Sequence, residues 1–347
     1  MDKTQNLNII MLSNFDKNAG GRETWLYNFL PELLKDDNIN KINLFGHRLS
    51  TDSNNSKNIL SLDFNINRKQ RLFPNIIKVK SSRFPRALSM FLGLKKQKDI
   101  VSSSKDITLA VGVFETLMML YIYPFKKTKK VVWLRSIFSH EKAYAIPSYL
   151  QNLFLWVEIK ILKKADILIC NGEDIKAFYK ENGLMVNVIK NGVDVSKWNI
   201  NIPKLKDPIQ IAYIGRLSQV KGIESYLKLI NKVKKSSIAN KFNFNVVGNN
   251  GVYKDQVKNL ENKKWLINYG LMSYDNLPQF LSTVDICVAL TFASNSGGGG
   301  GTSNAMLEQM AASRIIIAWN NIIFNQYLND ENAYLVEQFS VDGLEKH

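Results

Sequence analysis

The sequence predicts an α/β protein built from two doubly wound parallel sheets that face each other across a cleft. Apolar strand-like runs alternate with segments of helical spacing in both halves of the 347-residue chain. A polar segment over residues 196–208, with prolines at both 203 and 208, separates the halves and has the composition of a linker. We therefore expect one domain over residues 1–195 and a second over residues 196–347.

The N-terminal half contains a series of short apolar runs that we expect to be strands. They cover residues 8–12, 42–45, 107–113, 130–134, 167–170 and 186–189. The first run leads into a polar loop that ends in Gly20 and Gly21, and a helix follows. Residues 50–105 are polar and basic, and their pattern favours no assignment. The apolar-rich segment 148–164 favours a core helix over the alternative of a membrane-surface helix.

The C-terminal half repeats this alternation. Strands are expected at residues 209–214, 242–247, 265–269 and 285–290, and helices at residues 223–235, 277–283 and 304–312. Arg216 and Lys221 follow the first of these strands and precede its helix, so they lie on a loop at the carboxyl end of a strand. Two cations beside a helix amino terminus suit a diphosphate. Two solvated side chains on an ordinary connection are the alternative.

A run of five glycines, residues 297–301, precedes the last expected helix. Glycines let backbone amides approach a ligand closely, and Thr302 or Ser303 is a suitable N-cap. Glu308 then lies just over one turn into the helix on the face of Asn304, from which it can reach a ligand hydroxyl. A flexible linker and a solvated carboxylate are the alternative interpretations.

The charge is positive and unevenly distributed. The chain carries a formal net charge of +16, and residues 1–199 hold 31 Lys and Arg against 18 Asp and Glu. A basic N-terminal half indicates an anionic partner such as acidic lipid, a phosphorylated acceptor or nucleic acid. The alternative is a solvated lysine-rich surface without a binding role. No recognition motif or interleaving of aromatic and basic residues supports nucleic acid, so we expect none as a partner.

The two cysteines, Cys170 and Cys287, each fall in an apolar strand-like run. Two buried thiols favour no disulfide framework and fit a reducing compartment. No apolar run is long enough for a signal peptide or a membrane span. We therefore expect a cytoplasmic protein. The basic N-terminal half leaves open peripheral association with the inner face of a membrane.

Several short motifs occur in a fixed order along nearly the whole chain. They are Gly20-Gly21-Arg22-Glu23, Asn191-Gly192-Val193-Asp194, the stretch from Tyr213 to Gly222, Val246-Val247-Gly248, Asp285-Ile286 and the stretch from Thr302 to Ala311. Together they resemble the retaining glycosyltransferases of family 4, which have the GT-B fold of two facing Rossmann-like domains. The resemblance implies transfer of a sugar from a UDP- or GDP-type donor to a glycan or polyprenyl-linked acceptor, in surface polysaccharide biosynthesis, without a metal or other cofactor.

The resemblance also implies roles for particular residues. Arg216 and Lys221 hold the diphosphate and stabilise its developing charge, and Glu308 binds the nucleotide ribose. The remaining residues expected near the donor nucleotide and its phosphates are Gly20, Gly21, Gly215, Gly248, Gly301, Thr302, Ser303 and Asn304. Family members often carry a histidine where this chain has Arg135, and His140 is the nearest substitute for a catalytic role.

Other positions depart from the family pattern. Gly300 stands where the family has the first of two glutamates, which contacts the donor sugar, and Ser313-Arg314 replaces a step that commonly contains glycine. The usual helix that crosses back to the N-terminal domain is expected to be missing, either because the sequence is truncated or because the protein lacks this helix. Because of these departures, a second hypothesis is that the protein is a catalytically impaired relative of the family, which binds nucleotide without transferring a sugar. A basic nucleic-acid-binding protein is the third hypothesis, based on charge alone.

Overall fold

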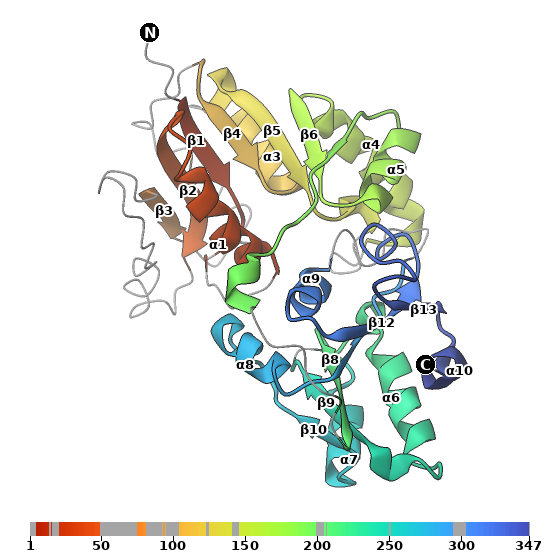
Figure 1. The fold of residues 1–347 in the computed structure, drawn as a ribbon. Helices are drawn as coiled ribbons and strands as arrows, with labels where there is room; N and C mark the ends of the chain where they lie inside the picture. Colours follow the sequence, from red (N-terminus) through yellow and green to blue (C-terminus); the bar gives the residue numbers. More distant parts are fainter. Residues whose placement is uncertain are drawn as a thin grey trace. The chain divides into compact units, whose positions relative to one another are not determined.

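The computed structural model describes residues 5–13, 15, 21–48, 75–80, 92, 94, 104–122, 125–140, 146–198, 205, 207–249, 251–293 and 303–346 (Figure 1). Backbone contacts divide the chain into two compact units. The first comprises Met1–Asn171 with Ile175–Ile189, and the second comprises Gly172–Asp174 with Lys190–His347. Residues 190–195, expected in the first domain, therefore group with the second unit.

The first unit contains a seven-stranded parallel sheet in the order β3-β2-β1-β4-β5-β6-β7. The strands are β1 (Gln5–Ile10), β2 (Ile39–Arg48), β3 (Asn75–Lys80), β4 (Ile107–Ala110), β5 (Lys129–Leu134), β6 (Ile167–Cys170) and β7 (Asn187–Val188). In the register of the sheet, Ile9 pairs with Leu44 on one side and with Leu109 on the other. The strand expected over residues 107–113 ends early, because Gly112 turns the chain at a φ of 120° and a helix begins at Val113.

Helices cover both faces of this sheet, as expected for a doubly wound fold. They are α1 (Gly21–Leu33), α3 (Val113–Tyr121), α4 (Ser148–Leu162) and α5 (Glu173–Glu181), with the short 3-10 turns η2 (Phe125–Lys127) and η3 (Phe138–His140). Successive residues of β1 point to opposite faces. Ile9 packs in one core with α1, whereas Ile10 packs in the other core with α3 and α5.

Helix α4 has nearly the expected extent but not the expected burial. Of its residues, Glu158, Ile161 and Leu162 are buried. Val157, which the sequence pattern assigns to the core, is exposed. The prediction of a core helix is therefore wrong for much of α4, because apolar residues occur on both of its sides and only one side packs against the unit.

The second unit contains a six-stranded parallel sheet in the order β10-β9-β8-β11-β12-β13. Its strands are β8 (Ile209–Ile214), β9 (Phe242–Val247), β10 (Leu266–Asn268), β11 (Ile286–Ala289), β12 (Ile315–Asn320) and β13 (Tyr334–Glu337). Its helical elements are η5 (Val195–Trp198), η6 (Gln219–Lys221), α6 (Ile223–Val233), η7 (Ala239–Lys241), α7 (Lys254–Asn262), η8 (Tyr274–Asn276), α8 (Leu277–Leu281), α9 (Asn304–Ala311) and α10 (Val341–Lys346). The strand order reverses between β8 and β11, which is where sheets of this type bind ligands.

Both ends of the second unit are fixed by packing. Trp198, in the segment expected to be a linker, is fully buried in a core with residues of α8. At the other end, α10 packs on α6, where Leu344 is buried and Lys232 forms ion pairs with Asp342 and Glu345. Within the described parts of the chain, no helix combines the length and the apolar character needed to span a membrane.

Candidate functional site

The loop that leaves β8 has the predicted strand–turn–helix structure. The Gly215 amide donates to the Val247 carbonyl at 2.9 Å, which extends the pairing of β8 with β9. The chain then passes through η6 and reaches α6 at Gly222, which adopts a left-handed conformation at a φ of 76°. The Tyr213 hydroxyl donates to the Arg216 carbonyl at 2.7 Å, and burial raises the pKa of that hydroxyl. The side chain of Tyr213 in β8 therefore fixes the backbone at Arg216.

Glycines allow three loops to meet at this edge of the sheet. A Cβ on Gly222 would lie 2.1 Å from the Leu290 carbonyl oxygen, at the end of β11. A Cβ on Gly248, after β9, would lie 2.0 Å from the Gly215 carbonyl oxygen, and one on Gly251 would lie 1.8 Å from that of Leu217. Real side chains cannot approach backbone this closely. The carboxyl ends of β8, β9 and β11 are thus packed backbone to backbone.

The two predicted cations lie on this packed loop. Arg216 is exposed and Lys221 is half-buried. Among the described residues, none forms an ion pair with Arg216. The Phe292 amide donates to the Val220 carbonyl at 3.1 Å, which ties the segment beside Lys221 to the loop after β11. A guanidinium without a protein carboxylate, on a rigid backbone, is suited to an anionic ligand.

Helix α9 begins at the same carboxyl edge, since it follows β11. Ser303 is its N-cap, and its hydroxyl oxygen accepts from the Met306 amide at 3.4 Å, so this part of the cap prediction is confirmed. Asn304 accepts at Oδ1 from Asn191 Nδ2 at 2.7 Å, which fixes the first turn of the helix. The predicted site residues Gly301 and Thr302, and the departure at Gly300, lie outside the described residues.

Glu308 is a buried carboxyl in α9. Among the described residues, none donates a hydrogen bond to it, and burial raises its pKa to about 8. A buried acid without a partner disfavours its charged form, so Glu308 is largely protonated at neutral pH in the free protein. Such groups cluster at functional sites because a purely structural role rarely compensates for their burial.

The departure from the family pattern at Ser313-Arg314, after α9, has a structural explanation. Ser313 has a φ of 55°, the left-handed conformation for which glycine is favoured. Arg314 donates from Nε to the Ala312 carbonyl at 2.6 Å and from Nη1 to the Val284 carbonyl at 2.9 Å. Ser313-Arg314 therefore forms a turn at the amino end of β12, at the edge opposite to the loop of Arg216.

In the first unit, the predicted residues that the structure describes are Gly21, which follows β1, and His140, which follows β5. Gly20 lies outside the described residues, and Gly21 is the first residue of α1. His140 ends η3, after β5, with Nδ1 3.1 Å from the Ser139 hydroxyl and its ring edge-on to Phe178 at 5.1 Å. Its catalytic role stays a prediction.

Sequence reasoning missed the buried Glu158, which positions η3. Its carboxylate accepts from the amides of Phe138 and Ser139, at 3.1 and 3.0 Å, and from the Tyr179 hydroxyl at 2.5 Å. Burial, reinforced by this carboxylate, raises the pKa of Tyr179. A charged residue inside an apolar helix pattern was the available signal, because such residues are rarely buried without partners.

A second missed cluster surrounds Arg135, directly after β5. Its guanidinium lies 4.7 Å from the centroid of the Trp133 ring, and its Nη1 is buried without a hydrogen-bond partner. Burial and the neighbouring Arg22 guanidinium lower the pKa of Arg135 to about 10, against an opposing effect of Glu23. Glu23 itself accepts from the Ser13 hydroxyl at 2.6 Å. Two cations and one carboxylate therefore gather at the ends of β1 and β5.

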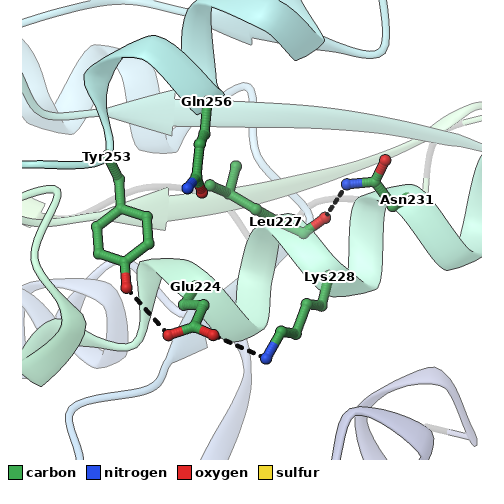
Figure 2. Close-up of a pocket in the computed structure, with 6 residues that line it drawn as sticks. All are labelled: Glu224, Leu227, Lys228, Asn231, Tyr253 and Gln256. Carbon is green, nitrogen blue, oxygen red and sulfur yellow. Dashed lines mark hydrogen bonds and ion pairs between the residues drawn. The ribbon is translucent and has the colours of Figure 1, made fainter.

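A hollow between α6 and α7 has a different character (Figure 2). Glu224 there accepts from the Tyr253 hydroxyl at 3.0 Å and pairs with Lys228 at 2.7 Å, and these contacts lower its pKa. Its charged groups satisfy each other, and none of the predicted site residues lines it. Among the described residues, no three His, Cys, Asp or Glu side chains converge to hold a metal ion.

Comparison with known proteins finds a family match for the C-terminal part of the chain. Residues 194–347 match the family model described as Glycosyl transferases group 1. No curated protein matches the sequence.

Among solved structures, the chain is similar to sucrose-phosphate synthase from Thermosynechococcus elongatus, with a TM-score of 0.74, 14% identity and coverage of 99% of this chain and 88% of that one. It is also similar to TarM (TM-score 0.72, 13% identity, 99% and 90% covered) and to HepE from Anabaena in complex with UDP (0.68, 15%, 99% and 88%). These likenesses confirm the predicted fold class: two parallel-sheet α/β domains of the GT-B type.

We expect Gly222→Ala to disrupt the packed edge. The new Cβ meets the Leu290 carbonyl in addition to the strain of a left-handed alanine, so the variant loses at least about 3 kcal/mol of stability. Gly183→Ala is a matched control, because Gly183 has a similar φ of 74° but open space around it, and it loses only about 1–2 kcal/mol. Calorimetric melting of both variants checks this, and equal losses would contradict the steric argument.

We expect Glu308→Gln to change how stability depends on pH. Because the folded-state pKa of Glu308 is raised from 4.5 to about 8, the folded chain binds more protons than the unfolded chain between these two pH values. The wild type therefore loses stability as pH rises from about 4.5 to about 8, by an amount on the order of a few kcal/mol, and Glu308→Gln does not. Chemical denaturation at pH 5 and pH 8.5 checks this; parallel curves for the two proteins would show that Glu308 is not a protonated buried acid.

Proposed function

We propose that this chain is a glycosyltransferase that moves a sugar from a nucleotide diphosphate sugar to a glycan or lipid-linked acceptor. The observation that carries the proposal is the pairing, at one sheet edge, of the rigid loop of Arg216 with the helix that holds the buried Glu308. The family match over residues 194–347 supports glycosyl transfer as the activity. HepE, a structural neighbour, has been solved with UDP and with UDP-glucose, which supports a nucleotide-bound donor.

We assign binding of the nucleotide sugar donor to the second unit. Arg216, Lys221 and the amino terminus of α9 bind the diphosphate, because all three belong to the carboxyl edge where the strand order reverses. Glu308, one turn into α9, accepts from the ribose hydroxyls. Hydroxyl donors stabilise a carboxylate, so nucleotide binding lowers the raised pKa of Glu308. The ribose hydroxyls then supply the hydrogen bonds that the buried carboxyl lacks in the free protein.

The chemistry follows from charge. Breaking the bond between the sugar and the diphosphate leaves negative charge on the departing phosphate oxygen. Fixed cations and helix amides on a rigid backbone stabilise that charge without reorganising as the reaction proceeds. We propose retention of the anomeric configuration: the acceptor hydroxyl attacks from the face that the diphosphate leaves, and the departing oxygen takes up the acceptor proton. This route requires neither a second catalytic carboxylate nor a metal ion.

We assign binding of the acceptor to the first unit. The cationic cluster of Arg22 and Arg135 at the ends of β1 and β5 favours an acceptor that carries negative charge, such as a polyprenyl pyrophosphate-linked glycan. TarM has been solved with fondaparinux, α-GlcNAc-glycerol and UDP, which supports glycan-like acceptors among structural neighbours. His140, held through η3 by Glu158, is proposed to lie along the path of the acceptor.

We expect UDP or GDP to protect the protein against thermal unfolding. At about a hundred times its Kd, a nucleotide stabilises the folded state by about 2.7 kcal/mol, which raises the melting temperature by several degrees. Arg216→Ala removes a charge-assisted contact of about 1.5–3 kcal/mol and abolishes most of that protection. Thermal melting with a set of nucleotide sugars, followed by mass spectrometry of products from a polyprenyl-linked acceptor, checks the proposal.

Lys228→Ala is the matched control for Arg216→Ala. It also removes one exposed cation from the second unit, but that cation pairs with Glu224, so nucleotide protection should persist. If no common nucleotide protects the wild type, the donor assignment is wrong. Protection without any product would instead favour the catalytically impaired relative suggested by Gly300, in which Gly300→Glu is expected to restore donor hydrolysis. No observation in the structure favours nucleic-acid binding.

A further inference from the structure

One face of α4 exposes a continuous stripe of apolar and aromatic side chains. Tyr149 is 81% exposed, Leu153 and Trp156 are each 54% exposed, and Val157 is 40% exposed. At the helical repeat, these residues and the following Lys160 and Lys164 fall within an arc of about 100°. Apolar side chains of this size gathered on one exposed face indicate an interaction surface.

The stripe belongs to a helix that is firmly held on its other side. Glu158 accepts hydrogen bonds from η3 and from Tyr179 of α5, and Ile161 and Leu162 are buried beside it. The helix also packs against α3. The exposed side chains are therefore presented on a rigid support.

Lysines cluster at the carboxyl end of the stripe. The Lys160 ammonium lies 3.7 Å from the centroid of the Trp156 ring, and Lys164 donates to the hydroxyl of Tyr121, itself 52% exposed, at 2.9 Å. Lys163 is exposed next to them. Lys126 and Lys127 of η2 and Lys129 at the start of β5 are further exposed lysines of the first unit. The acid of α4, Glu158, points inward, so the helix contributes no negative charge to this face.

This combination matches the interface of a bilayer with anionic lipid. Tyrosine and tryptophan favour the boundary between headgroups and acyl chains, leucine and valine favour the acyl side, and lysines extend along the surface to the phosphates. A second copy of the chain fits less well. Two such faces would bring together Lys160, Lys163 and Lys164 of both copies, and the helix offers no exposed acid to neutralise them.

We propose that this face, formed by α4 from Tyr149 to Lys160 with Lys163 and Lys164 directly after the helix, seats the protein on an anionic lipid surface. The proposal rests on the exposure and charge of α4 and does not depend on the assigned reaction. It specifies the membrane contact that the basic N-terminal half led us to expect. A protein held this way acts on an acceptor embedded in the same surface.

The test measures binding of the full chain to vesicles by co-sedimentation. We expect binding to vesicles of phosphatidylcholine with phosphatidylglycerol, weakened by salt, and little binding to phosphatidylcholine alone. Leu153→Ser with Trp156→Ser should weaken binding about ten-fold or more. Lys160→Gln with Lys163→Gln and Lys164→Gln should weaken it about five-fold per lysine, or about a hundred-fold together.

Matched controls come from the second unit. Ile267→Ser with Leu271→Ser removes two equally exposed apolar side chains. Lys254→Gln with Lys258→Gln and Lys263→Gln removes three exposed lysines in and just after α7. These variants should bind vesicles like the wild type, and all variants should keep its melting temperature and nucleotide protection.

Three results would overturn the proposal. The wild type could fail to bind anionic vesicles, or the α4 variants could bind no more weakly than the control variants of the second unit. The third is a dimer, seen by analytical ultracentrifugation, that the apolar α4 variant dissolves while vesicle binding is unchanged; the face would then be an interface between copies. None of these results affects nucleotide protection, so failure here is distinguishable from failure of the proposed reaction.

Discussion

Backbone packing at the carboxyl edge of the second sheet is the constraint on which the candidate site depends. Gly222, Gly248 and Gly251 each pack against a backbone carbonyl of a neighbouring loop. A Cβ atom at any of these three positions would collide with that carbonyl oxygen. The loop of Arg216 is thereby fixed by its neighbours, together with the buried side chain of Leu217. A fixed cation is what charge stabilisation requires, since a group that must first reorganise stabilises a developing charge less.

Two buried glutamates differ in their hydrogen-bond partners, which separates a carboxylate that supports the fold from one that we propose binds a ligand. Glu158 has donors on both carboxylate oxygens, so its charge is satisfied and it serves the fold. Glu308 is comparably buried, yet no described residue donates to it, and its raised pKa reflects that lack. A buried acid without partners lowers stability and is retained where a ligand supplies the missing donors.

Much of the fold could be predicted from the sequence, because apolar periodicity and glycine-bearing turns report local structure directly. Strand β9 and the start of α6 lie where the pattern predicts them. Strand β3 escaped prediction because it lies in a polar, basic segment, and the burial of α4 was misjudged because both of its sides are apolar. Periodicity identifies a helix but does not tell which of two apolar sides faces the protein.

The candidate site was predictable only as a set of residue types on loops. The sequence predicts Arg216 and Lys221 on a loop at a strand end and Glu308 in the helix over residues 304–312, but the missing donors around Glu308 depend on packing between segments far apart in the chain. The cluster of Arg135 with Arg22 likewise joins α1 to the end of β5, more than a hundred residues later. Such proximity follows from strand order, which a single sequence does not contain.

The two sides of α4 have one mechanical consequence. Its outer side carries Trp156 and Lys160, while Glu158 on its inner side holds the backbone of Phe138 and Ser139. One carboxylate thus couples the position of the backbone segment that ends in His140 to the position of α4.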